Sequence, residues 1–226
     1  MKEYFKTCIR WPMGCLIFLL AACNNSKQYN DLVITREDSL ATEAKIKRAF
    51  DTISNIRPKI QTGDLVTRTG NDFTSESLRS LNQRNQTYSH CGIASIENDT
   101  LFVYHALGGE WNPDQKIRRD PLYFFADPYN NRGLGVFRFT VADSIKINMQ
   151  KVVKDLYIKG IMFDMDFDLK TNERMYCAEF VYKSIEWASH NRLIFPHSHI
   201  KDFEFIGVDD IFMHPLCIPR EQIVYK

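Results

Sequence analysis

The sequence predicts an α+β fold in which an antiparallel sheet packs against a helix that begins at a cysteine. Apolar strand patterns over 89–96 and 101–106 flank the turn signal Asn98–Asp99, as in a β-hairpin. From Cys177 onwards, apolar residues recur three and four positions apart, which indicates a helix over 177–188. With 44% hydrophobic and 25% charged residues, the 226-residue chain has the composition of a globular protein with one buried core.

The beginning of the chain has the order of an export signal. Basic residues precede the apolar run 14–22, which is too short to span a membrane comfortably. The run ends in the sequence Leu-Ala-Ala-Cys at 20–23, which resembles the lipobox of bacterial lipoproteins. This resemblance implies removal of residues 1–22 and lipidation of Cys23. The chain would then be anchored in the bacterial cell envelope, on the periplasmic side of either membrane or at the cell surface. A plain secretory signal or a short anchor is the alternative.

After such processing, three cysteines would keep their thiols: Cys91, Cys177 and Cys217. An odd number of thiols in an oxidising compartment leaves at least one of them unpaired within the chain. We expect Cys177 to be the free one. Cys91 and Cys217 either pair with each other or pack as core residues.

Three segments follow from the N-terminal pattern. Residues 1–22 are the predicted signal peptide, 23–58 a lipidated tether with an N-terminal helix, and 59–226 the main domain. The helix starts near Thr35 and stops at Pro58, because proline cannot continue a helix. It either packs on the domain or remains a free amphipathic spacer.

Within the main domain, local patterns predict a series of short elements. A strand is predicted at 63–68, a helix at 74–81, a further strand at 116–119, a short helix from Asp120 to Phe125, and another strand at 135–139. The pattern of residues 144–159 indicates a longer helix, and Gly160 suits its C-terminal cap. The segments 206–208 and 218–224 are candidates to close the sheet.

Two patterns raise the question of a metal ion. Residues 161–168 alternate apolar and acidic side chains, which predicts a strand with Asp164, Asp166 and Asp168 on a solvated face; a cation site is the alternative. His197 and His199 form an H-x-H pair of the kind that can ligate zinc. Since no convincing third ligand accompanies them, we predict neither a metal nor another cofactor.

The candidate catalytic residues are Cys177, His90 and His105. Cys177 falls in the first turn of its helix, where free N–H groups and the helix dipole favour a thiolate. His90 starts one strand of the hairpin and His105 ends the other, so antiparallel pairing makes them neighbours. A thiol nucleophile needs a base, and the base needs an orienting partner. We therefore predict that Cys177 is the nucleophile, His90 the base and His105 the orienting group.

The alternatives are a buried structural cysteine at 177 and a buried, hydrogen-bonded His105. Cys91 points away from His90 and is predicted to pack.

Taken together, these motifs resemble the YiiX/YebB-like permuted papain-like hydrolases of the NlpC superfamily, which are related to the lecithin:retinol acyltransferase group. The similarity covers about 63–187, and its matching segments are 63–64, 88–93, 103–106, 160–164 and 176–181. It implies a circularly permuted papain-like fold, with Cys177 as nucleophile and His90 as base. His105 stands where the family often has glutamate. Phe163 stands where the family often has tyrosine, and it cannot donate a hydrogen bond.

The expected function is that of a lipid-anchored cysteine hydrolase, an amidase or peptidase that cleaves an amide or ester bond. Its substrate would be a cell-wall peptide or an acylated small molecule. A ligand-binding module on the same fold and an acyltransferase are the alternatives. The partners expected are the substrate and, through Cys23, a membrane. The formal net charge of +1 offers no broad electrostatic case for nucleic acid.

Overall fold

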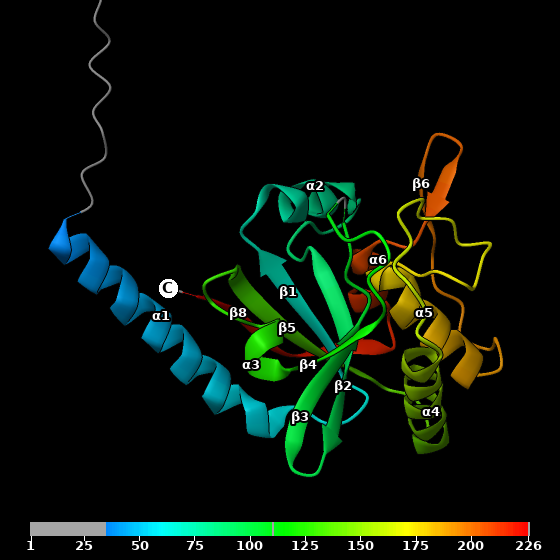
Figure 1. Cartoon of the computed structure of the whole chain (residues 1–226). Coiled ribbons are helices and arrows are strands. Elements are labelled where there is room, and N and C mark those ends of the chain that lie inside the picture. The colour runs from blue at the N-terminus through cyan, green and yellow to red at the C-terminus, as the bar shows by residue number, and fades with distance from the viewer. Residues whose placement is uncertain (1–34, 110, 226) are drawn as a thin grey trace, which may run out of the picture. The chain divides into compact units, whose positions relative to one another are not determined.

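Figure 1 shows the computed structural model, which describes residues 35–109 and 111–225. The predicted signal peptide 1–22, the lipidation site Cys23 and the tether 24–34 lie outside the described residues. The described chain is mixed α+β, as predicted, and it is built on a six-stranded antiparallel sheet. Within the described part, no helix is both long and apolar enough to cross a membrane.

The strands of this sheet lie in the order β4-β3-β2-β1-β5-β8. They span Leu65–Gly70 (β1), His90–Glu97 (β2), Thr100–His105 (β3), Arg118–Pro121 (β4), Asn131–Phe139 (β5) and Cys217–Val224 (β8). The predicted hairpin is present as β2 and β3. Asn98 and Asp99 form its turn with φ angles of 47° and 62°, a conformation that Asn and Asp tolerate better than most residues.

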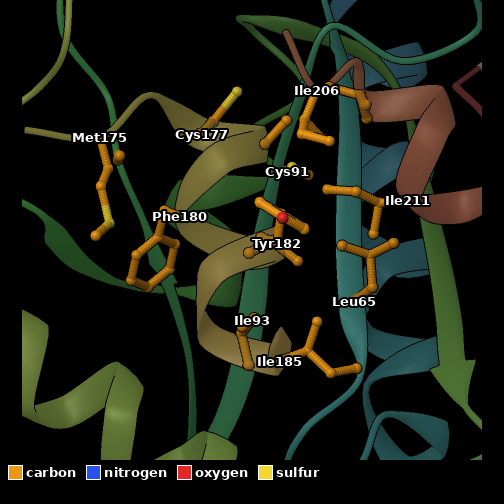
Figure 2. Packing of buried hydrophobic residues seen from close by; sticks show 14 of the residues in the cluster. Leu65, Cys91, Ile93, Met175, Cys177, Phe180, Tyr182, Ile185, Ile206 and Ile211 are labelled. Atoms are coloured by element: carbon orange, nitrogen blue, oxygen red, sulfur yellow. The ribbon is translucent and has the colours of Figure 1, made fainter. Parts of the chain in front are cut away.

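One face of the sheet is covered by α4 (Asp143–Lys159) and α5 (Cys177–Ala188). Phe180 and Ile185 of α5 belong to the same buried cluster as Cys91 and Ile93 of β2, as Figure 2 shows. Gly160 ends α4 in the left-handed conformation, with φ of 69°, as its predicted cap role requires. The short helix α6 (Val208–Phe212) adds to this cluster. Helix α5 is therefore held against the sheet along its length.

The opposite face is covered by α1 (Arg36–Ile56) and α3 (Leu122–Phe125). In α1 only the C-terminal half is buried, through Ala49, Ile53 and Ile56, while residues 36–45 are exposed. The helix therefore packs on the domain by its last turns. The short 3-10 helix η1 (Arg57–Lys59), which contains the predicted stop signal Pro58, ends it.

The acidic segment 161–168 is not the predicted strand. Only Met162 makes isolated bridges, to Lys116 and Arg174, and Asp164 is buried rather than solvated. Its carboxylate accepts the backbone N–H groups of Asp166 at 2.9 Å and Asp168 at 2.7 Å. Aspartate often satisfies nearby backbone donors in this way, which favours a loop over a strand ladder.

Other predicted boundaries differ for reasons of tertiary packing. Val208 begins α6 instead of a strand, whereas β8 does close the sheet beside β5. The strand predicted at 116–119 is β4, displaced by two residues, and it ends at Pro121 on the sheet edge, where proline is tolerated. Helix α2 (Phe73–Leu81) agrees with prediction. A small hairpin of β6 (Ser198–Ile200) and β7 (Phe203–Phe205) was not predicted.

Candidate active site

The thiol of Cys177 lies at the first residue of α5. Tyr176 precedes it as the N-cap, and the Glu179 carboxylate accepts the Tyr176 backbone N–H at 3.2 Å. The local sequence thus fixes the start of the helix at the cysteine, because Glu179 satisfies one of the free N–H groups of the first turn. The side chain is largely buried, with 7% of Cys177 exposed.

The surroundings of Cys177 lower its pKa below the usual value for cysteine. The neighbouring Cys91 thiol contributes most, and it outweighs burial, which acts in the opposite direction. Backbone N–H groups of Cys91 and Ala178, together with the positive charge of Arg68, act in the same direction as the Cys91 thiol. Burial raises the pKa of Cys91 itself well above the usual range, so Cys91 stays protonated beside the Cys177 sulfur. A thiolate at Cys177 therefore has several donors close by.

His90 and His105 form a hydrogen-bonded chain that ends at Asp120. His90 Nε2 lies 2.8 Å from His105 Nδ1, and His105 Nε2 lies 3.0 Å from Asp120 Oδ2. Arg118 also binds the carboxylate of Asp120, with Nε 2.9 Å from Oδ2 and Nη2 3.1 Å from Oδ1. Although burial opposes ionisation of Asp120, the hydrogen bonds from His105 and Arg118 keep its pKa below the ordinary value. Asp120 is thus an acceptor at neutral pH.

This chain fixes the tautomer of both neutral histidines. An ionised Asp120 can only accept, so His105 carries its proton on Nε2 and accepts at Nδ1. His90 must then donate from Nε2, which leaves Nδ1 as its basic nitrogen. Burial is the main cause that lowers the pKa of His105 to about 4 and that of His90 well below 6.5. Both imidazoles are neutral at pH 7, and His90 Nδ1 is available to take a proton.

Strand alternation places His90 and Cys91 on opposite faces of β2. Cys91 is in the core under α5, whereas the ring of His90 lies against Phe125 of α3 at 5.7 Å between centroids. Among the described residues, no hydrogen bond joins Cys177 to His90. Both sequence neighbours of His90 nevertheless lie near the thiol: Cys91 as described above, and Ser89, which lines the same surface pocket as Cys177. The backbone at His90 therefore passes beside Cys177.

Three residues of this arrangement are not predicted from the sequence: Asp120, Arg68 and Cys91. Cys91 is predicted only to pack, and its thiol also lowers the pKa of Cys177. The sequence predicts Asp120 at a helix start, but it lies in β4. In this strand Arg118, two residues before Asp120, pairs with His105 of β3. Arg68 of β1 pairs with His90, and its guanidinium lies over the Phe125 ring at 5.0 Å. Cys91 is buried as predicted. The only signal in the sequence for any of them was the possible strand near 116–119, which brings an acidic residue to the edge beside His105.

All three described cysteines are free thiols, so the possible pair Cys91–Cys217 is not formed. Cys217 lies in β8 and burial raises its pKa above the usual range. The expectation that Cys177 is free holds, and it now applies to Cys91 and Cys217 as well.

Replacing Cys91 by alanine is expected to raise the pKa of Cys177, because the largest contribution to its lowering is removed. Alkylation of Cys177 by iodoacetamide at pH 7 should become slower, since the thiolate is the reactive species. Mass spectrometry after limited labelling across a pH series measures this. Cys217→Ala is the matched control, because it removes another buried thiol from the same core cluster. An unchanged rate in Cys91→Ala would show that Cys91 only packs.

Comparison with solved structures identifies the fold. The chain is similar to the metalloprotein YiiX from Escherichia coli O157:H7, DUF1105, known from a crystal structure. The two chains are 18% identical, and the TM-score is 0.56 over 74% of this chain and 97% of that one. The fold is therefore YiiX-like. No protein-family model matches the chain, and no curated protein matches it.

A metal ion does not fit the described residues. Within 35–109 and 111–225, no group of three or more His, Cys, Asp or Glu side chains is placed to hold one. In the H-x-H pair of the sequence, His197 Nδ1 lies 2.6 Å from Glu204 Oε1, and His199 Nε2 lies 3.7 Å from the same oxygen. Asp164 is likewise engaged by its own loop.

Proposed function

We propose that this protein is a cysteine hydrolase that cleaves an amide or ester bond, on a circularly permuted papain-like version of the YiiX-like fold. The observation that carries the proposal is the site around Cys177. The Cys177 thiol has a lowered pKa and lies at the first residue of a helix, and the buried hydrogen-bonded chain His90–His105–Asp120 begins at the residue before Cys91, the neighbour of that thiol. Lipidation of Cys23 would anchor the enzyme in the bacterial cell envelope, with a membrane as its partner.

In the proposed reaction the Cys177 sulfur attacks the substrate carbonyl carbon, and His90 Nδ1 accepts the thiol proton. The imidazolium then donates this proton to the leaving amine or alcohol as the C–N or C–O bond breaks. Water, deprotonated by His90, attacks the thioester and releases the carboxylic acid and the free thiol. The backbone N–H of Cys177, at the helix N-terminus, is a donor for the oxyanion. Phe163 lacks the hydroxyl that related sites often carry.

An acyl-enzyme on Cys177 is the decisive test. The full chain is incubated with a p-nitrophenyl ester, and intact-mass spectrometry follows the protein while absorbance follows p-nitrophenolate. The expected result is a transient mass increase by one acyl group, mapped to Cys177, together with continued turnover. Cys177→Ala should show neither. Turnover that persists in Cys177→Ala would overturn the mechanism.

A ligand-binding module without turnover is the second candidate. It is favoured by the missing hydrogen bond between Cys177 and His90 among the described residues, although such contacts often tighten only when substrate is bound. An acyl adduct that forms on Cys177 and is never released would support this reading. Release to an added amine or alcohol in preference to water would identify an acyltransferase instead.

A further inference from the structure

Arg68 of β1 carries a positive charge close to the two groups of the proposed mechanism. It pairs directly with His90 of β2, and residues that face each other across an antiparallel pair stand on the same side of the sheet. The Ser89 N–H donates to the Arg68 carbonyl at 3.0 Å, and Ser89 lines the same surface pocket as Cys177. Arg68 therefore lies at the end of the sheet where a substrate of Cys177 must bind.

The guanidinium of Arg68 has few partners within the protein. Nη1 donates to the Phe125 carbonyl at 2.8 Å, and the group lies over the Phe125 ring at 5.0 Å. Neither contact supplies a negative charge. The side chain is partly buried, and although burial lowers its pKa, arginine keeps its charge in proteins. Because a guanidinium carries several N–H donors in one plane, an edge of the group is left for a ligand.

The two carboxylates whose charges act on Arg68 belong to Asp120 and Asp72, and both already bind other groups. Asp120 contacts His105 at 3.0 Å and Arg118 at 2.9 Å and 3.1 Å. Both oxygens of Asp72 accept hydrogen bonds at the start of α2. Within the described part of the chain, no carboxylate forms an ion pair with Arg68. A partly buried charge without a contact partner favours the binding of an anion.

We infer that Arg68 binds a carboxylate on the leaving group of the substrate and so determines the specificity of the enzyme. The inference rests on the proposed function and narrows its substrates to acyl derivatives of amino acids and hydroxy acids, peptides included. The side of the scissile bond follows from His90, which protonates the leaving group and stands on the same face as Arg68. A carboxylate matches the planar donor edge of a guanidinium, and its one negative charge balances the one positive charge.

In this reaction the Cys177 sulfur forms a bond to the acyl carbon, and the C–N or C–O bond breaks. His90 gives its proton to the amine or alcohol, which departs with its carboxylate still held by Arg68. Water then hydrolyses the thioester as in the proposed function. Arg68 exchanges no proton with the substrate, so its contribution is to bind the leaving group and to orient it beside His90.

Alkylation of Cys177 by a charged and by a neutral reagent tests this charge without turnover. Iodoacetate and iodoacetamide both form a bond between sulfur and a CH₂ group as iodide leaves, and both react with the thiolate. The ratio of their rates therefore does not depend on the pKa of Cys177. Relative to the same ratio for N-acetylcysteine, iodoacetate should be favoured at Cys177 of the full chain by about tenfold at low ionic strength. Peptide mapping distinguishes Cys177 from the other cysteines.

Arg68→Gln should abolish this preference, whereas Arg68→Lys keeps the charge without the planar fork and should retain part of it. Arg57→Gln is the matched control and should equal wild type. Arg57 is also partly buried and donates to a backbone carbonyl, that of Asp99, but it does so at the hairpin turn, the opposite end of β2 from His90. Thermal unfolding checks that each variant is folded. An equal rate ratio in wild type, Arg68→Lys and Arg68→Gln would overturn the inference.

Hydrolysis of p-acetoxybenzoate and p-acetoxybenzamide separates this inference from the proposed function. Their leaving groups differ in charge, and division by the rates with imidazole, a neutral nucleophile, removes the difference in intrinsic reactivity. The normalised kcat/KM of the full chain should be about tenfold higher for the benzoate, and Arg68→Gln should make the two values equal. Hydrolysis that depends on Cys177 but shows no such preference would overturn the inference and leave the proposed function standing. A preference for iodoacetate in a protein that hydrolyses neither ester would support the anion site at Arg68 and refute the proposed function.

Discussion

Replacing His90 by alanine is expected to lower kcat/KM for ester hydrolysis by about 10²–10⁴-fold, the usual contribution of a general base. The reason is the hydrogen-bonded chain that runs from His90 through His105 to Asp120. Asp120 and His105 leave His90 Nδ1 as the unprotonated nitrogen, and burial keeps the pKa of His90 well below 6.5. A neutral imidazole can accept the thiol proton at pH 7, whereas alanine leaves water as the only acceptor.

The same variant should leave the pH dependence of Cys177 alkylation almost unchanged. The lowered pKa of Cys177 has its causes in the Cys91 thiol, nearby backbone N–H groups and Arg68, and His90 is not among them. Turnover and thiol reactivity would therefore separate in His90→Ala. A loss of both would indicate that an imidazolium at His90 holds the thiolate as an ion pair.

His90 is buried, so the control must exclude a folding defect. His90→Gln keeps most of the volume and a hydrogen-bond donor, and thermal unfolding of both variants is compared with wild type. His199→Ala removes a histidine whose side chain is 58% exposed in the small β6–β7 hairpin, and it should retain full activity. Activity within a few-fold of wild type in a folded His90→Ala would assign the base to another group.

The pairing of His90 with His105 was predictable because a hairpin is a local structure. The turn signal Asn98–Asp99 and the alternation on both sides determine the register, in which Ile93 pairs with Tyr104. His90 and His105 are then diagonal neighbours on one face, within reach of two imidazole rings. The start of α5 was predictable for a similar reason, since the helical period begins at Cys177.

Asp120 could not be predicted in the same way. Its contact with His105 requires β4 to add to the free edge of β3, and nothing local to 116–121 specifies that neighbour. The Asp-Pro sequence is equally suited to a helix start, and the sequence alone therefore predicts a helix there. Cys91 presents a related problem: alternation predicted its face correctly, but its position beside Cys177 depends on how α5 crosses β2. Contacts between elements distant in sequence arise from packing, which a single sequence does not display.

Replacing Lys183 by methionine is expected to destabilise the protein by about 3–5 kcal/mol, the usual cost of removing one partner of a buried ion pair. Lys183 Nζ lies 2.7 Å from Glu179 Oε1, with 6% and 0% of the two side chains exposed. The ammonium also donates to the Thr171 carbonyl. Methionine has a similar length, so packing is largely kept while Glu179 loses the charge that balances it.

This loss should depend on pH in a defined direction. Burial raises the pKa of Glu179 from 4.5 to about 7, even though Lys183 acts to lower it. As pH rises from 4.5 to 7, Glu179 loses its proton in the unfolded chain before it does in the folded protein. The Glu179 carboxyl group therefore lowers the free energy of unfolding over this range. Without Lys183 the pKa of Glu179 rises further, so the free energy of unfolding continues to fall as pH rises above 7. The difference in unfolding free energy between wild type and Lys183→Met should therefore be larger at pH 8 than at pH 4.5.

Urea unfolding at the two pH values measures this difference, and Glu179→Gln/Lys183→Met is the control. The double variant leaves no unpaired charge, so it should recover part of the stability and lose most of the pH dependence. The rate of ester hydrolysis by this double variant should also show whether the Glu179–Lys183 pair matters for catalysis. Glu179 accepts the Tyr176 N–H and so holds the residue before the nucleophile, a bond that glutamine can still make. If Lys183→Met proved as stable as wild type at pH 8, Glu179 would have to be protonated in the native protein, and the start of α5 would be held by a neutral acid.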